Sequence, residues 1–129
     1  MHSTGHVMPA RVGSLLLALT LLTGPAQADP VTIEDVRASE GANGWRFDVT
    51  LRHPDTGWDH YADAWQVLAP DGSVLGTREL AHPHVDEQPF TRSLSGIAVP
   101  QDADHVLIRA RCLVDGWNEG TVRFDLPGR

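Results

Sequence analysis

The chain of 129 residues contains no lysine and a single cysteine, Cys112. Its 10 basic residues are all arginines, and with 17 acidic residues they give a formal net charge of −7. This balance argues against nucleic-acid binding, which needs a basic surface to neutralise phosphates. A single cysteine excludes an internal disulfide framework and a cysteine-rich zinc site. Hydrophobic residues make up 41% of the chain, too large a share for a disordered tail.

Long apolar runs are also scarce, and the only one, at residues 12–23, lies near the start of the chain. Arg11 precedes this run and Ala-Gln-Ala at 26–28 follows it, which is the pattern of a secretory signal peptide with its cleavage site. The run is shorter than the ~20 apolar residues that span a bilayer. We therefore expect residues 1–28 to be a signal peptide and residues 29–129 to be one periplasmic or secreted domain, not inserted in a membrane. An uncut N-terminal anchor is the alternative.

Apolar and polar residues alternate with a period of two through the expected domain, which is typical of strands with one buried face. The clearest example is formed by Trp45, Phe47, Val49 and Leu51. The parity slips near Glu34-Asp35, which predicts a β-bulge. No apolar stripe recurs at helical spacing, so no helix is expected. The pattern predicts seven strands, at 31–38, 44–53, 61–68, 73–80, 89–95, 105–112 and 121–126.

Seven short strands separated by turn signals, in about 100 residues, are typical of an antiparallel β-sandwich. A small closed barrel is the alternative. With Trp45 early in the second strand, and a strand–loop–strand running from Val106 to Phe124, the chain resembles fibronectin type III and immunoglobulin-like domains. It lacks a tyrosine in the sixth strand and the paired cysteines of antibody domains. The resemblance implies a seven-stranded all-β sandwich but no particular function.

Two further segments, Trp58-Asp59-His60-Tyr61 and residues 82–90, are similar to those of small secreted bacterial proteins without an assigned role, which implies no activity. If consecutive strands run in opposite directions, the BC, C′E and FG loops, at 54–60, 81–88 and 113–120, lie at the same end. Loops on a rigid scaffold are where binding residues usually lie. We therefore expect these three loops to recognise a partner protein or a small ligand. The candidate contact residues are Trp58, Asp59, Tyr61, Asp86, Glu87 and Trp117.

The aromatic members of this set are typical of a stacking platform or of anchors in a protein interface. In the simpler interpretation, Trp58 and Trp117 fold over the open end of the core and cover it. The functional interpretation requires them to stay accessible.

Histidines are the second notable feature of this end. In an extended segment, residues two apart point the same way, so His82 and His84 could bind one ion together. Imidazole and carboxylate ligands suit Zn or Cu(II). A divalent-metal protein that uses His60, His82 and His84, completed by His53, is therefore the alternative function. The competing interpretation is that these are ordinary surface histidines, and no other cofactor is expected.

Catalysis is not expected. Asp86 and Glu87 are neighbours that point apart in an extended chain, so they do not form a facing acid–base pair. Cys112 shares the core-facing phase of Val106 and Ile108, which predicts a buried small hydrophobe and not a nucleophile. We expect a monomeric, non-enzymatic binding module. Without Arg11, 9 basic residues remain against 17 acidic ones, and the resulting charge of −8 repels nucleic acid and anionic membranes.

Overall fold

The computed structural model describes residues 29–129, so the predicted signal peptide lies outside the described residues. Within that range the chain forms only strands. They are β1 (Thr32–Gly41), β2 (Gly44–Arg52), β3 (Ala62–Leu68), β4 (Val74–Glu79), β5 (Phe90–Ile97), β6 (His105–Cys112), β7 (Gly116–Trp117) and β8 (Val122–Asp125). The all-β class predicted from the alternation is confirmed. No helix among the described residues has the length and apolar character needed to cross a membrane.

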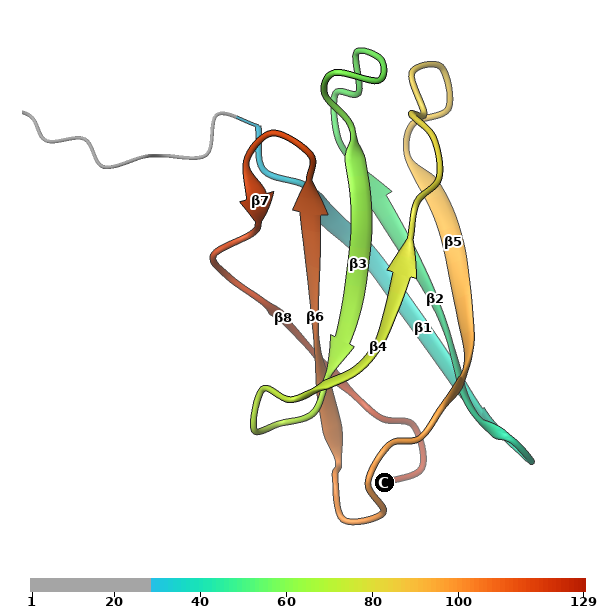
Figure 1. Ribbon diagram of the computed structural model, residues 1–129. Coiled ribbons are helices and arrows are strands. Elements are labelled where there is room, and N and C mark those ends of the chain that lie inside the picture. Colours follow the sequence, from blue (N-terminus) through green and yellow to red (C-terminus); the bar gives the residue numbers. More distant parts are fainter. Residues whose placement is uncertain (1–28) are drawn as a thin grey trace, which may run out of the picture.

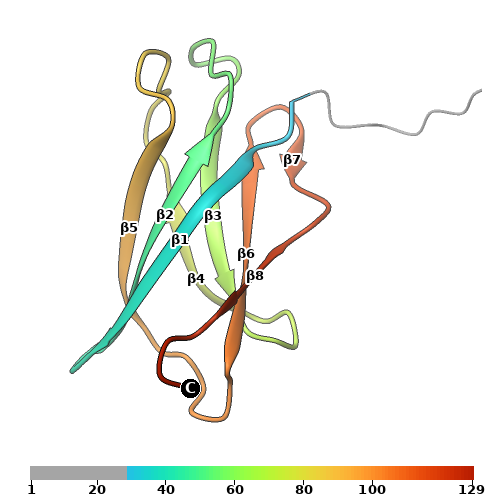
Figure 2. The same cartoon turned by 180° about the vertical axis from the view of Figure 1, so that it is seen from behind.

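Two antiparallel sheets face each other, an arrangement that fits a β-sandwich (Figure 1). The first has the strand order β1-β2-β5. In the second, β4 pairs with β3, β3 pairs with β6, and both β7 and β8 pair with β6. Consecutive strands β4 and β5 therefore belong to different sheets, and the chain crosses between the sheets in the loop that joins them (Figure 2).

The sheets approach each other closely where β4 faces β5. Gly76 on β4 permits this approach, because a Cβ atom there would lie 2.6 Å from Cδ1 of Ile97 on β5. Next to it, the Nε of Arg78 donates a hydrogen bond to the carbonyl of Ser93, at 2.9 Å. A glycine and an arginine thus close one edge of the two-sheet body.

Alternate side chains from both sheets fill the space between them. In β2 and β6, buried and less buried residues alternate along the strand as the sequence predicts. The largest fully buried side chains are Trp45, Trp65, Phe47, Phe90, Leu51, Ile108 and His53. Burial of such apolar side chains contributes ~1.5–3 kcal/mol each. His53 is the unusual member, since a buried imidazole needs polar partners.

The boundaries and the strand count differ in part from the expectation. The bulge predicted near Glu34-Asp35 is confirmed by a register shift between Ile33 and Asp35 in the pairing of β1 with β2. An eighth strand, β7, is added because Gly116 has a φ of 80° and turns the chain back onto β6. A two-residue strand is too short to show any alternation in a sequence.

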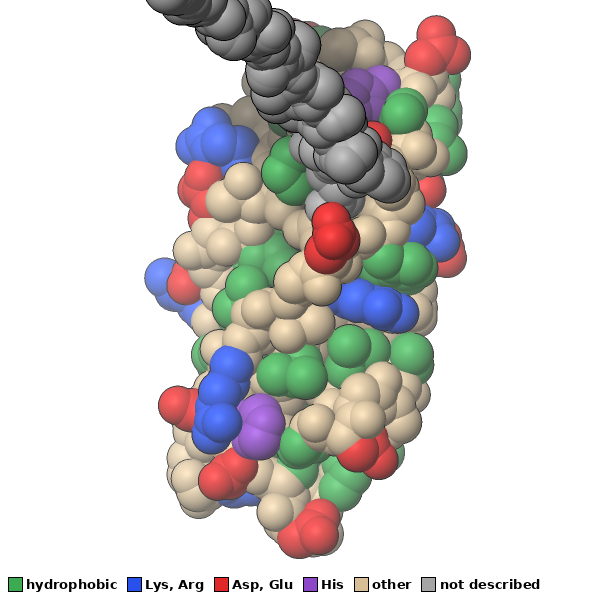
Figure 3. All heavy atoms as spheres, turned by 90° about the vertical axis from the view of Figure 1, so that its left-hand side faces the viewer, with side chains coloured by type: hydrophobic (Ala, Val, Ile, Leu, Met, Phe, Trp, Pro, Cys, Tyr) green, Lys and Arg blue, Asp and Glu red, His purple; other side chains and the backbone are tan. Residues whose placement is uncertain are grey.

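Three loops lie at the same end of the molecule: β2–β3, β4–β5 and β6–β7 (Figures 1 and 2). Alternating strand direction places them there, as expected. The side that carries β7 and β8 presents acidic and basic side chains interspersed among apolar ones (Figure 3). Arg123 and Asp125 of β8 form one such pair, at 2.9 Å. Exposed pairs of this kind contribute only about 0–1 kcal/mol, so this side is an ordinary solvated surface.

Candidate functional site

A buried carboxylate organises the end that carries the three loops. The side chain of Asp55, in the β2–β3 loop, is fully buried. Its Oδ1 accepts hydrogen bonds from Nδ1 of His53, at 2.6 Å, and from the backbone N–H of Ala62, at 3.0 Å. Its Oδ2 accepts from the backbone N–H of His84, at 2.8 Å. These donors offset the cost of burying the carboxylate, and they join the β2–β3 loop to the β4–β5 loop.

Three other hydrogen bonds extend this connection. The side-chain amide of Gln88 accepts from the N–H of His53, at 3.0 Å, and donates to the carbonyl of His84, at 2.8 Å. The N–H of Leu113, in the β6–β7 loop, donates to the carbonyl of Tyr61, at 2.9 Å. All three loops are therefore linked by hydrogen bonds into one unit, which we call the rim.

His84 is held as a neutral imidazole within the rim. Its ring stacks on Phe90, with centroids 3.8 Å apart and an angle of 10° between the planes. Its Nε2 lies 2.8 Å from Nη2 of Arg92, a group that can only donate, so Nε2 accepts. Arg92 also pairs with Glu87, at 3.1 Å. Burial, and then the positive charge of Arg92, lower the pKa of His84 below its ordinary value.

The four predicted metal ligands fall into two pairs. The rings of His82 and His84 have centroids 4.6 Å apart, and those of His53 and His60 are 4.8 Å apart, edge to face. His53 and His60 join Cys112 in a group whose potential ligand atoms all lie within 4.8 Å of one another. In the described part of the chain, this is the group of three or more such residues that is close enough to hold an ion.

The predicted contact residues also differ in their surroundings. Trp58 is 66% exposed, and its ring packs edge to face on that of Tyr61, with centroids 5.8 Å apart. Trp117 instead lies under two guanidinium groups, 4.5 Å from that of Arg109 and 5.0 Å from that of Arg111. The predicted acidic contacts, Asp59, Asp86 and Glu87, are all exposed on the loops.

Sequence reasoning did not single out the other apolar residues at this end. Val85 is 52% exposed, and Leu113 and Val114 are 46% and 62% exposed. With Trp58, they place at least one exposed apolar side chain on each of the three loops, and we call these four residues the loop tips. The sequence did contain a signal for these positions, because all four are apolar residues that lie outside the alternating strand segments.

The structural centres of the site were also not predicted as such. Asp55 and Gln88 look like ordinary loop residues in the sequence, and their role depends on contacts with another loop. The burial of Cys112 was predicted from its strand phase and is confirmed. Its proximity to His60 depends on the pairing of β3 with β6, which a strand pattern alone does not specify.

One curated protein is similar to this chain over a limited stretch. A protein of Halomicrobium mukohataei described as "Putative lipoprotein" is 44% identical over 79 residues. The match covers 61% of this chain and 38% of the relative, so the chain spans well under half the length of that protein. No family model matches the chain, and no solved structure matches it. The similarity therefore identifies no activity, and the geometry of the rim carries the functional argument.

Proposed function

We propose that the protein is a non-enzymatic binding module, exported to the periplasm or beyond the cell, whose loop tips dock on a basic protein surface. The signal-peptide pattern at residues 1–28 supports export. The similarity to a protein described as a lipoprotein agrees with a place in the cell envelope.

The single observation that carries the proposal is the position of the exposed apolar side chains. Six large hydrophobic residues are exposed in the described chain, and four of them are the loop tips. The other two, Val74 and Val122, lie at the start of β4 and of β8. Exposed apolar side chains gathered at one end of a molecule are typical of an interaction site. A tryptophan among them is the residue type most often found as an energetic anchor.

The rim is also organised before any partner arrives. Its loops are joined through Asp55, Gln88 and the bond from Leu113 to Tyr61. Ordering flexible loops on binding costs free energy, so a preorganised rim binds with less loss of conformational entropy. Such a rim suits recognition of a rigid protein surface.

Charge favours a basic protein as the occupant. Exposed acids lie next to the loop tips on two loops, Asp59 beside Trp58 and Asp86 beside Val85, and Glu119 lies on the segment after β7. Anionic lipid headgroups repel such a rim, whereas a protein with arginines or lysines around an apolar pocket complements it. The domain-wide charge of −8 expected for residues 29–129 acts in the same direction.

We further propose that the fold is of the fibronectin type III kind. The support is the place of β4, which pairs with β3 in the sheet of β6. In constant-type immunoglobulin domains, four strands lie in the sheet of the first strand and three in the other. Here the sheet that contains the first strand has three strands, so the arrangement differs from that of a constant-type immunoglobulin domain.

Site-specific photo-crosslinking in the producing cells tests the docking proposal. A photoreactive residue at position 85 or 114 is expected to trap the same protein, and Trp58→Ala is expected to abolish both adducts. Position 122 provides the matched control, because Val122 is an exposed valine away from the rim. Equal trapping at position 122, trapping of lipid, or adducts that survive Trp58→Ala would contradict the proposal.

The alternative function, metal binding, is favoured by His53 and His60 and not by the whole predicted set. The Nε2 of His84 already accepts from Arg92, and a guanidinium beside a cation site opposes binding. His53 and His60, in contrast, lie beside a thiol.

A further inference from the structure

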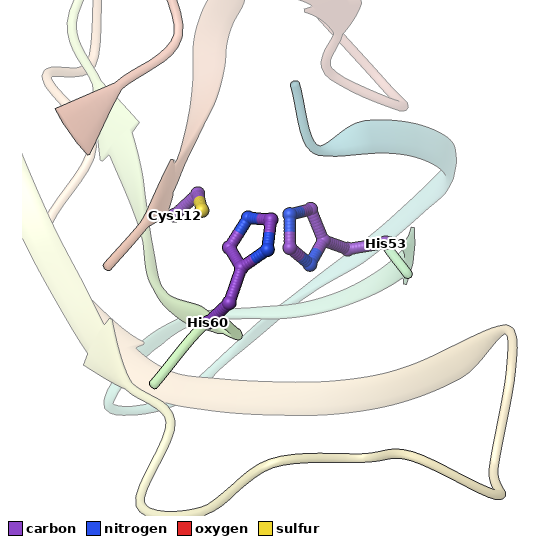
Figure 4. A group of neighbouring side chains, drawn as sticks. All are labelled: His53, His60 and Cys112. Carbon is purple, nitrogen blue, oxygen red and sulfur yellow. The ribbon is translucent and has the colours of Figure 1, made fainter. Parts of the chain in front are cut away.

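Three side chains converge where the rim meets the second sheet. His53 directly follows β2, His60 precedes β3, and Cys112 is the last residue of β6. Their potential ligand atoms all lie within 4.8 Å of one another. Figure 4 shows the ring of His60 between the thiol of Cys112 and the ring of His53. Two imidazoles and a thiol are thus gathered at one point, and the thiol is fully buried.

One atom in this group lacks the partner that its burial requires. The Nε2 of His60 is shielded from solvent and has no hydrogen-bond partner within the described residues. The Oδ2 atom of Asp29 lies 4.0 Å from this nitrogen, which is beyond hydrogen-bond distance. A buried polar atom left unpaired costs about 1–3 kcal/mol. A ligand that accepts the lone pair of this nitrogen removes that cost.

His53 has the surroundings of a metal ligand. Its Nδ1 forms a hydrogen bond with the carboxylate of Asp55, at 2.6 Å. Histidines that bind a metal through one nitrogen usually donate the other N–H to a carboxylate or carbonyl, which fixes the ring and makes it a stronger ligand. The Nε2 of His53 faces the carbonyl of Asp29, at 3.0 Å, and exchanges that contact for the ion.

We propose that His53, His60 and Cys112 form a Zn²⁺ site, with the carboxylate of Asp29, 4.0 Å from Nε2 of His60, available for the fourth position. Thiolate and imidazole together are ligands that zinc prefers, in a tetrahedral arrangement with Zn–N of about 2.0 Å and Zn–S of about 2.3 Å. Ligand atoms in such a site are about 3.3–3.6 Å apart, so the group contracts by about 1 Å on binding. The thiol of Cys112 transfers its proton to solvent as the Zn–S bond forms.

This site differs from the one predicted from the sequence. It keeps His53 and His60, adds Cys112, and leaves out His82 and His84. Its ligands belong to the β2–β3 loop and to β6, so the ion fastens the rim to the second sheet. The inference is independent of the docking proposal, because its ligands lie behind the loop tips and not among them.

Metal titration of the purified, reduced and EDTA-treated protein tests the proposal. Zn²⁺ alone is expected to bind with one ion per chain and to raise the Tm by about 10 °C or more at a hundredfold excess over Kd. Co²⁺ as a spectroscopic substitute is expected to give tetrahedral d–d bands and a sulfur-to-cobalt charge-transfer band. The charge-transfer band is a direct report of Cys112, the only cysteine in the chain.

Variants identify the ligands. His60→Ala and Cys112→Ala are expected to lower zinc affinity at least about 100-fold, and Cys112→Ala to remove the charge-transfer band. His60 makes no bond through Nε2, so His60→Ala retains the fold even if the buried Cys112→Ala proves less stable. His82→Ala is the matched control, an exposed histidine of the same end, and leaves both signals unchanged. Absence of stoichiometric uptake, zinc affinity that is unchanged in His60→Ala, or signals that disappear in His82→Ala would each overturn the proposal.

Discussion

The backbone N–H of His84 donates a hydrogen bond to Oδ2 of Asp55 at 2.8 Å, across 29 positions of the sequence. This bond joins the β2–β3 loop and the β4–β5 loop, each of which connects a strand of one sheet to a strand of the other. The other oxygen of the same carboxylate holds His53 and the first residue of β3, Ala62. One side chain therefore sets the position of the β4–β5 loop relative to the β2–β3 loop, and with it the arrangement of the rim.

Replacement of Asp55 by alanine is expected to be strongly destabilising. The change leaves three buried donors, on His53, Ala62 and His84, without their acceptor, and each such loss costs about 1–3 kcal/mol. We expect the free energy of unfolding in urea to fall by at least about 3 kcal/mol. Asp59→Ala, an exposed acid of the same loop, is the control and is expected to change it by less than about 0.5 kcal/mol. Similar losses in the two variants would show that the Asp55 contacts do not hold the rim.

His84 is expected to make the protein less stable in mild acid. Burial first, and then Arg92 and His82, lower its pKa below the ordinary value of 6.5, against smaller opposite effects of Glu87 and Asp55. As the pH falls below about 6.5, the unfolded chain takes up a proton at His84 that the folded chain still refuses. The unfolded state then binds more protons, so the free energy of unfolding decreases through this window. Above it, the contribution is constant.

The His84→Gln variant tests that dependence. Glutamine keeps an acceptor for Arg92 but does not titrate, so its Tm is expected to fall less than that of the wild type between pH 7.5 and pH 5. The relevant quantity is the difference between the two proteins at each pH, because other groups titrate equally in both. Parallel curves over this range would contradict the assignment to His84.

The two tryptophans of the predicted contact set are expected to behave differently when truncated. Trp117 packs under Arg109 and Arg111, so Trp117→Ala is expected to cost about 1–2 kcal/mol of unfolding free energy from lost cation–π contacts alone. Trp58 is largely exposed, so Trp58→Ala is expected to cost less than about 1 kcal/mol. Urea denaturation followed by circular dichroism measures both. If Trp58→Ala were the more destabilising change, Trp58 would be a cover of the core and not a docking anchor.

A side chain at position 76 is expected to crowd Ile97 and to destabilise the fold. A Cβ atom at this position lies 2.6 Å from Cδ1 of Ile97 and 3.1 Å from Leu94, so Gly76→Ala is expected to cost about 1–3 kcal/mol through overpacking. Ile97→Val removes the clashing methyl group, so the double variant is expected to recover part of the loss. Gly120→Ala, where the added atom meets open space, serves as control. Thermal denaturation of the wild type, Gly76→Ala, the double variant and Gly120→Ala measures these changes. Equal losses of stability in Gly76→Ala and in the double variant would exclude the clash.

Strand positions were predictable because burial of one face leaves a direct trace in the sequence. The alternation of Trp45, Phe47, Val49 and Leu51 reappears as the buried face of β2. The meeting of the loops was predictable too, since it follows from alternating strand direction. The contacts of Trp117 were not, because they depend on β7 pairing back onto β6 at Arg111.

The candidate site was predicted only in its general location. Which histidine meets which partner is decided by contacts between loops, such as the bond from Arg92 to His84. Such contacts depend on side-chain rotamers and loop conformations, and neither produces a periodic pattern in the sequence. His82 and His84 were predicted to bind an ion together, with His60 and His53 as further ligands. Cys112 was interpreted as core because its strand phase is apolar.

The bulge between Ile33 and Asp35 has a consequence for the behaviour of the protein at high concentration. β1 is the outer strand of its sheet and is 10 residues long, so its free side offers unpaired backbone groups to a second copy. An extra residue in the strand bends it and interrupts the regular spacing of those groups. A second chain cannot extend the ladder along the whole of β1. The bulge thus opposes the pairing of a second chain with the first part of β1.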